Sequence, residues 1–357
     1  MATKKSGQIV GVDAHVLTGK YQGSRTWLEG VLGELPALTP ENSYIIYSRD
    51  PATAERVCSG PNVEHRRIPI DDPVGRLLLY WPLVARRDRL DVLLTQYIAP
   101  PFFTRRQVVV VHDILFETHP QFFPPVMRWR NRLLVRASVD RAARVLTVSR
   151  FTRDELVRRY RVPADRILLA PNAVPPPVVA GPRLVDGPYV LFVGRIEPRK
   201  NLDLLLDSLE RLDRPGLRLV VVGRPDFGAA STERRLADNP RLVHRSDVPA
   251  EELAALYRHA AVLAFPSQGE GFGLPVLEAL RFGTPVVCSN TTALPEIAGA
   301  FARYFDPLAA NAIDDLAQAI AATLDSPLAL DPERLAKHLA GFTWRNAALA
   351  VAEAISI

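Results

Sequence analysis

Short apolar runs alternate with helical patterns along the whole chain. Runs rich in β-branched and aromatic residues predict strands at Ile9–Val12, Tyr44–Tyr47, Val92–Leu94, Val108–Val111, Val145–Val148, Tyr189–Val193, Leu217–Val222, Val262–Phe265 and Val286–Cys288. The segments between these runs carry the apolar spacing of amphipathic helices. Strands that alternate with helices predict parallel sheets covered on both faces, and therefore an α/β fold.

A proline-rich segment divides this pattern into two halves. Residues 171–188 read P-N-A-V-P-P-P-V-V-A-G-P-R-L-V-D-G-P and carry little helix or strand signal. A chain of 357 residues exceeds what one hydrophobic core usually supports. We therefore expect an N-terminal domain over residues 1–175 and a C-terminal domain over residues 176–341, with a cleft between them. Phe342 and Trp344 precede a final helix, Arg345–Ile357, and predict a docked segment.

Composition narrows the class of protein. Hydrophobic residues make up 48% and charged residues 23% of the chain, which is ordinary for a soluble protein. No apolar run approaches the ~20 residues of a membrane span, and Met1–Gly7 lacks a signal-peptide core. Cys58 and Cys288 have no metal or redox spacing. These features predict a reduced, cytoplasmic protein.

Positive charge is concentrated in the first half. Residues 1–175 hold 26 Lys and Arg against 17 Asp and Glu, a net charge of +9, whereas the remainder has a net charge of −4. The segment Met127–Arg144 places arginines around a helix with leucine and valine between them. It is either a solvated helix face or a contact with an anionic membrane surface or lipid-phosphate acceptor, at the inner membrane face. Nucleic-acid binding is disfavoured because no recognition motif is present.

The stretch E-G-F-G-L-P-V-L-E places Glu270 and Glu278 around a glycine loop. It predicts a strand, a loop and a helix, with Pro275 at the first helical position and Gly283 just past the end. Glu270 then lies in the loop and Glu278 about one turn into the helix, at the carboxyl end of a strand where open α/β sheets bind ligands. The loop glycines leave backbone N–H groups at a helix N-terminus, which suits a phosphate. A nucleotide sugar carries both hydroxyls and phosphate.

A second candidate segment follows the predicted strand Tyr189–Val193. It reads V-G-R-I-E-P-R-K-N and leads into the predicted helix Leu202–Leu212. Arg195 and Lys200 could bind a diphosphate there, Arg195 through its planar fork and Lys200 as a point charge. The alternative is a solvated basic turn, but two carboxylates in the same domain favour the diphosphate site.

Two segments of the first half are weaker candidates. His112 follows a predicted strand and is either a hydrogen-bonding group at the cleft or a structural histidine. His15, His112 and His119 lack metal-ligand spacing, so we expect no metal. The loop Leu17–Gly23 leads to a helix starting near Ser24, but it fails the G-x-G-x-x-G pattern, which argues against a dinucleotide-dependent oxidoreductase.

Other hydrolase and nucleotide-binding signatures are absent from the sequence. Gly-x-Ser-x-Gly and Walker A motifs do not occur. Glu270 and Glu278 could form a glycosidase pair, but Arg195 and Lys200 favour a phosphorylated leaving group over hydrolysis.

These motifs resemble the retaining glycosyltransferases of family 4, which have the GT-B fold. V-G-R-I-E-P-R-K-N-L is similar to the family's diphosphate-binding segment, and F-P-S-Q-G-E-G-F-G-L-P-V-L-E-A-L to its E-x7-E signature. The resemblance covers nearly the whole chain. It implies two Rossmann-like domains whose parallel sheets face each other across a cleft, with the helix at 342–357 crossing back to the first domain.

The resemblance also implies site roles. Arg195 and Lys200 would bind the donor diphosphate, Glu270 the donor sugar and Glu278 the ribose. His112 would line the sugar pocket and, with Glu270, Arg195 and Lys200, form the catalytic group. The remaining donor-binding positions would be Gly271, Phe272, Gly273 and Leu274. The acceptor-side loop would contain Gly23, Ser24 and Arg25, where this chain lacks one glycine of the family's usual G-x-G-R-Y pattern.

The implied activity is transfer of a sugar from a nucleoside-diphosphate sugar to a hydroxyl of a glycan, glycolipid or small molecule. Transfer would retain the anomeric configuration and need no metal. The His112-Asp113 motif favours a mannosyltransferase-like subgroup in polysaccharide biosynthesis, and hence GDP-mannose. One alternative is a non-catalytic nucleotide-sugar-binding or scaffold protein on the same fold. A sugar-nucleotide epimerase is a third, against which the E-x7-E and R-x4-K spacings count.

Overall fold

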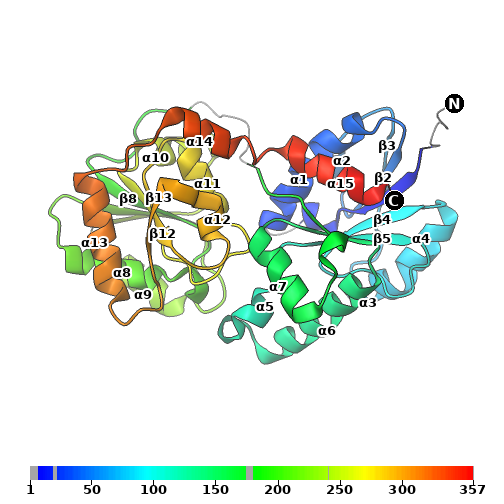
Figure 1. Cartoon of the computed structure of the whole chain (residues 1–357), viewed down its shortest axis with the longest axis horizontal. Coiled ribbons are helices and arrows are strands. Elements are labelled where there is room, and N and C mark those ends of the chain that lie inside the picture. Colours follow the sequence, from blue (N-terminus) through cyan, green and yellow to red (C-terminus); the bar gives the residue numbers. More distant parts are fainter. Residues whose placement is uncertain (1–6, 19–21, 174–179, 240, 357) are drawn as a thin grey trace. The chain divides into compact units, whose positions relative to one another are not determined.

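A computed structural model describes residues 7–18, 22–173, 180–239 and 241–356 (Figure 1). The chain divides into two compact units. Unit 1 comprises residues 1–173 and 342–357, and unit 2 comprises residues 174–341. Each unit is built on one parallel sheet with helices between most successive strands, so the predicted α/β fold is confirmed.

Unit 1 contains a sheet in the order β3-β2-β1-β4-β5-β6-β7. Its strands are β1 (Ile9–Asp13), β2 (Ser43–Ser48), β3 (Val63–Arg67), β4 (Val92–Gln96), β5 (Arg106–Val111), β6 (Arg144–Thr147) and β7 (Ile167–Leu169). Its helices are α1 (Gly23–Leu38), α2 (Pro51–Val57), α3 (Pro73–Gly75), α4 (Trp81–Arg87), α5 (Leu115–Thr118), α6 (Pro125–Arg141), α7 (Arg150–Tyr160) and α15 (Trp344–Ile355). The strand order reverses between β1 and β4, which are hydrogen-bonded neighbours.

Unit 2 contains a sheet in the order β10-β9-β8-β11-β12-β13. Its strands are β8 (Tyr189–Val193), β9 (Arg218–Val222), β10 (Leu242–Arg245), β11 (Val262–Phe265), β12 (Val286–Ser289) and β13 (Ala302–Phe305). Its helices are α8 (Leu202–Leu212), α9 (Ala230–Ala237), α10 (Ala250–His259), α11 (Leu274–Arg281), α12 (Leu294–Ala298), α13 (Ala312–Asp325) and α14 (Pro332–Leu339). Here the order reverses between β8 and β11.

Buried β-branched residues on the central strands hold each unit together. In unit 1, Val109 and Val111 of β5 pack with Val135 and Val139 of α6 in one apolar cluster. In unit 2, buried apolar residues of the strands pack with an apolar face of α8, whose Leu205 and Leu206 are buried. Continuous apolar strands covered by helices are typical of parallel sheets.

The final helix belongs to unit 1, as the sequence predicted for a docked C-terminal segment. α15 packs along α1, and the two helices lie side by side in Figure 1. A Cβ added at Gly30 of α1 would lie 2.1 Å from the Trp344 ring, so only glycine leaves room for this indole. The predicted start at Arg345 is one residue late, because Thr343 caps the helix by accepting a hydrogen bond from the Asn346 amide.

Candidate functional site

The switch point of the unit 2 sheet gathers the strongest candidate residues. The segment Gly194–Asn201 leaves the end of β8, and the loop carrying Glu270 leaves the end of the adjacent, parallel β11. Both segments therefore start at the same edge of the sheet, at the position where open α/β sheets bind ligands.

Glycine at position 223 allows the β8 segment to pack against the end of β9. Gly223 has φ +155°, and a Cβ there would lie 1.9 Å from the Gly194 carbonyl oxygen. The segment then forms a short 3-10 helix, Pro198–Lys200, which ends at Asn201 in the left-handed conformation (φ 57°). This turn directs both Arg199 and Lys200 inward, where they are buried.

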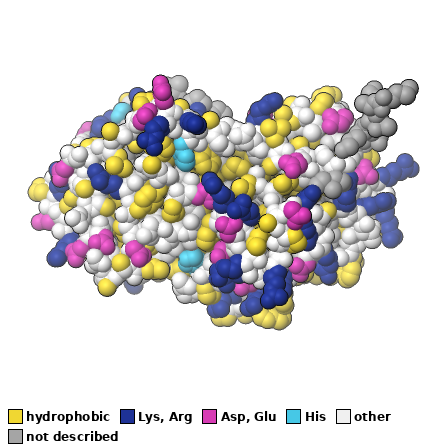
Figure 2. Space-filling view, in the orientation of Figure 1, with side chains coloured by type: hydrophobic (Ala, Val, Ile, Leu, Met, Phe, Trp, Pro, Cys, Tyr) yellow, Lys and Arg dark blue, Asp and Glu magenta, His cyan; other side chains and the backbone are white. Residues whose placement is uncertain are grey.

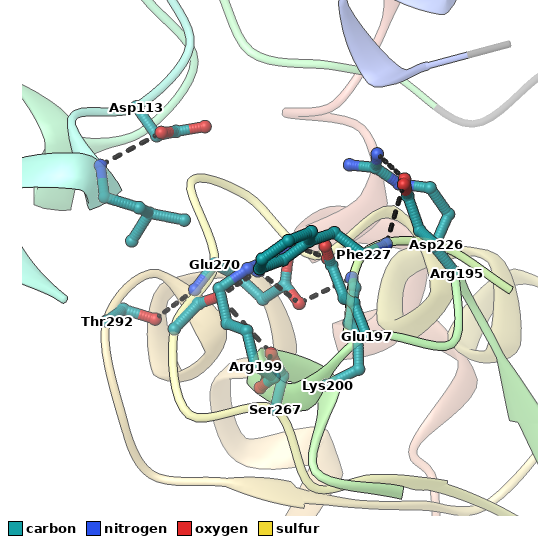
Figure 3. A network of polar contacts seen from close by, with 12 residues as sticks. Asp113, Arg195, Glu197, Arg199, Lys200, Asp226, Phe227, Ser267, Glu270 and Thr292 are labelled. Carbon is teal, nitrogen blue, oxygen red and sulfur yellow. Dashed lines mark hydrogen bonds and ion pairs between the residues drawn. The ribbon is translucent and has the colours of Figure 1, made fainter. Parts of the chain in front are cut away.

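Glu270 joins these two cations in a buried ionic network (Figure 3). The Lys200 ammonium donates to Glu270 Oε1 at 2.6 Å, and Arg199 lies 3.2 Å from the same oxygen. Arg199 also donates to the Gly269 carbonyl and, at 2.5 Å, to Glu197 Oε1. The Glu270 amide donates to Thr292 Oγ1 at 2.9 Å, which fixes the loop backbone. The loop is thereby tied to the β8 segment from both its side chain and its main chain.

Electrostatics keep Glu270 ionised. Burial alone would raise the pKa of its carboxyl, but Lys200 and Arg199 hold that pKa at about 2. Burial lowers the pKa of the Lys200 ammonium, and Glu270 acts in the opposite direction. Glu270 is thus a fixed acceptor of hydrogen bonds near neutral pH, and not a proton donor.

Glu278 lies in a different environment, one turn into α11. Gly273 precedes the helix with φ 110°, and α11 ends before Phe282 and Gly283, whose φ is 72°. The strand, loop and helix of the sequence prediction are therefore confirmed, but Pro275 is the second helical residue, after Leu274. Tyr257 of α10 donates to Glu278 Oε2 at 2.7 Å. Burial raises the pKa of Glu278 to about 7, although the Tyr257 hydroxyl lowers it.

Arg195 stands apart from the buried network. Its side chain is 42% exposed and its Nη1 donates to Asp226 Oδ2 at 2.6 Å. Figure 3 shows Asp226 and Phe227 beside Arg195 on the loop that follows β9. The structure therefore brings Lys200 and Glu270 into contact, while Arg195 and Glu278 each have a different partner.

His112 belongs to unit 1 and directly follows β5. Its Nε2 donates to Gln96 Oε1 at 2.6 Å, and Trp27 and Tyr97 pack around the ring. Burial lowers the pKa of His112 to about 3, so the imidazole is neutral near pH 7. With Nε2 protonated, Nδ1 is left as an acceptor.

The residues assigned to the acceptor side lie at the start of α1. Gly23, Ser24 and Arg25 form its first turn, so the helix begins one residue before the predicted start near Ser24. Arg25 is held by Glu29, one turn further on, at 2.7 Å. The preceding residues 19–21 lie outside the described part of the chain.

The sequence prediction missed three residues of the site. The first is Arg199, which lies in the same motif as Lys200 and contacts Glu270 but is not among the predicted site residues. Tyr257 and Thr292 come from segments far from Glu278 and Glu270 in the sequence, and no local pattern marks them. Among the described residues, no group of three or more His, Cys, Asp or Glu is arranged to hold a metal ion.

Known proteins resemble both units. Residues 23–177 match the family Glycosyltransferase Family 4, and residues 181–338 match Glycosyl transferases group 1. O-antigen chain mannosyltransferase B of Escherichia coli is 34% identical over 287 residues, covering 73% of each chain. O-antigen chain mannosyltransferase RfbU of Salmonella typhimurium is 30% identical over 206 residues, covering 57% of each chain.

Solved structures share the fold at lower identity. Sucrose-phosphate synthase from Thermosynechococcus elongatus superposes with a TM-score of 0.77 at 21% identity, over 97% of this chain and 98% of the other. Anabaena Alr3699/HepE in complex with UDP and glucose gives a TM-score of 0.72 at 18% identity, over 98% of this chain and 99% of the other. These likenesses establish the GT-B architecture of two Rossmann-like domains.

Proposed function

The chain belongs to the group 1, family 4 glycosyltransferases, and we propose that it transfers mannose from GDP-mannose to a hydroxyl of a glycan or glycolipid. The observation that carries the proposal is the buried contact of Lys200 and Arg199 with Glu270 at the switch point of unit 2. The names of the two O-antigen mannosyltransferase relatives support mannose as the donor sugar and a polysaccharide as the product.

In this proposal the cations stabilise the leaving nucleoside diphosphate. Lys200 is held in place by Glu270 before the donor arrives, which lowers the cost of ordering it. Arg195 is exposed enough to exchange its partner Asp226 for a phosphate oxygen. The amides of Gly271, Phe272 and Gly273 precede α11 and the amide of Leu274 begins it, so all four lie near the positive end of the helix dipole. Donors fixed before the reaction stabilise developing charge most effectively.

The two carboxylates have separate tasks in this proposal. Glu270 is ionised and accepts hydrogen bonds from hydroxyls of the donor sugar. Glu278 has one oxygen held by Tyr257, so its other oxygen is available to the ribose hydroxyls. Their different environments argue against a general acid and base pair of the glycosidase kind.

The remaining assignments rest on the family resemblance. His112, a neutral imidazole, would accept a hydrogen bond from a donor-sugar hydroxyl. Gly23, Ser24 and Arg25 would border the acceptor from the first turn of α1. The acceptor oxygen would attack from the face that the diphosphate leaves, with retention of configuration and without a metal.

A donor panel tests the proposal. The purified protein is heated alone and with GDP-mannose, UDP-glucose, dTDP-glucose or ADP-glucose. A true donor at about 100 times its Kd stabilises the folded protein by about 2.7 kcal/mol. We expect the largest rise in Tm with GDP-mannose. If none of the four raises the Tm of folded protein, the transferase assignment fails, and if another donor does so, the sugar or base is reassigned.

A further inference from the structure

One face of α6 in unit 1 is apolar and lies in solvent. The opposite face is buried: it carries Val135, Ser138 and Val139, and the two valines pack with β5 in the core of unit 1. On the solvent side, Val126 is 81%, Trp129 68% and Leu133 47% exposed. These residues are three and four positions apart, so they line one stripe along the outermost side of the helix. An exposed tryptophan between exposed aliphatic residues indicates a surface that binds a membrane or another molecule.

Arginines flank this stripe on both sides. Arg132 and Arg136 are one turn apart along one flank, and Arg130 and Arg141 are three turns apart along the other. Figure 2 shows Lys and Arg side chains among apolar ones at the lower edge of the molecule, where Figure 1 places α6.

Few acids neutralise the arginine flanks. α6 contains five arginines and a single acid, Asp140. Arg136 lies 4.0 Å from Asp140, and Arg132 lies 3.5 Å from Glu117. Both arginines and Asp140 are exposed, whereas Glu117 is mostly buried, so the two arginines reach solvent and can turn to another anion. The helix therefore presents an apolar stripe within a positive border.

We propose that α6 docks unit 1 on an anionic lipid bilayer, with Trp129 and its neighbours at the level of the headgroups. An apolar stripe bordered by arginines is the pattern of helices that lie in a membrane interface. The arginines match the charge of anionic lipids, and each contributes about a fivefold gain in binding near such a surface. A second copy of this chain fits less well, because two α6 faces would bring like charges together. The proposal does not depend on the assignment of donor or acceptor.

Vesicle binding with the full chain tests this surface. The protein is sedimented with phosphatidylcholine vesicles that contain or lack phosphatidylglycerol, at low and high salt. We expect binding only to the anionic vesicles and a strong loss of binding at high salt. Arg130→Gln and Arg132→Gln are each expected to weaken binding about fivefold. Arg218→Gln on the exposed start of β9 is the matched control and is expected to leave binding unchanged.

Tryptophan fluorescence provides a second measurement at the same site. Trp27 and Trp81 are fully buried and Trp344 packs against α1, so Trp129 is the strongly exposed tryptophan. On anionic vesicles, the Trp129 emission is expected to shift to shorter wavelength and to be quenched by brominated lipid. Trp129→Ala removes that signal and weakens binding, whereas Leu308→Ala, at a residue 67% exposed in unit 2, does not.

Three outcomes would overturn the proposal. The first is absence of binding to anionic vesicles at low salt, and the second is binding that Trp129→Ala leaves unchanged. The third is self-association that Trp129→Ala abolishes in the absence of vesicles, which would identify the α6 face as an interface between copies of the chain.

Discussion

Glu278 is expected to make the stability of unit 2 depend on pH. The pKa of its carboxyl rises from the ordinary value of 4.5 to about 7, because burial disfavours the charged form. The folded protein therefore holds this proton more tightly than the unfolded chain does. The resulting stabilisation is complete below pH 4.5 and is lost as the pH rises from 4.5 through 7.

The size of the effect follows from the pKa difference. Each unit of pKa shift corresponds to about 1.4 kcal/mol, so a shift to about 7 sets an upper bound of about 3 kcal/mol. Part of the Glu278 side chain reaches solvent, so we expect about half of that bound. Glu278→Gln removes the ionisation and keeps an oxygen for the Tyr257 hydroxyl. The variant is expected to lose less stability than the wild type between pH 5 and pH 8.

Urea unfolding of both proteins across this pH range measures the difference. The four tryptophans, at positions 27, 81, 129 and 344, belong to unit 1, so far-ultraviolet circular dichroism is the suitable probe of unit 2. Glu251→Gln, at an exposed position on the same helix as Tyr257, controls for loss of a surface charge. If the profiles of Glu278→Gln and the wild type stay parallel, the carboxyl is not held in its protonated form, and this reasoning is wrong.

Three further predictions concern the packing and charge of unit 2. In urea unfolding, Lys200→Met and Glu270→Gln should each cost about 3–5 kcal/mol. The double variant should cost less than their sum, because neither Lys200 nor Glu270 then remains as a buried charge that has lost the other. Gly223→Ala should lower the Tm by several degrees because its Cβ would overlap a carbonyl oxygen, whereas Gly33→Ala, with open space around it, should not. Tyr257→Phe should raise the Glu278 pKa further, since the hydroxyl now lowers it, and nucleotide binding measured against pH should shift to higher pH.

Edge strands explain what the sequence prediction missed in the fold. The nine predicted strands are all present, and the four that were missed, β3, β7, β10 and β13, are the outer strands of the two sheets. Inner strands are buried on both faces and form continuous apolar runs such as V-V-V-V of β5. Outer strands are partly exposed, as in V-E-H-R-R of β3, so their apolar pattern is broken and resembles a loop.

In the candidate site, too, the sequence predicts some features and not others. Glu270 and Lys200 could be predicted because each lies in a contiguous motif at the end of a strand, and the topology then brings the two motifs together. Their direct contact, and the participation of Arg199, depend on how the 3-10 turn directs its side chains. The different proton affinities of Glu270 and Glu278 come from Lys200, Arg199 and burial, which sequence spacing does not reveal.

The most direct test of the account compares sugar transfer and nucleotide binding in Glu270→Gln. The rate of transfer from GDP-mannose and the Kd for GDP are measured for the wild type and for this variant. Because Glu270 is assigned to the donor sugar and acts on the nucleotide only through Lys200 and Arg199, we expect transfer to fall by about 100-fold or more while the Kd for GDP rises by less than about tenfold. Unchanged transfer by the variant would contradict the assignment of this network as the site of sugar transfer.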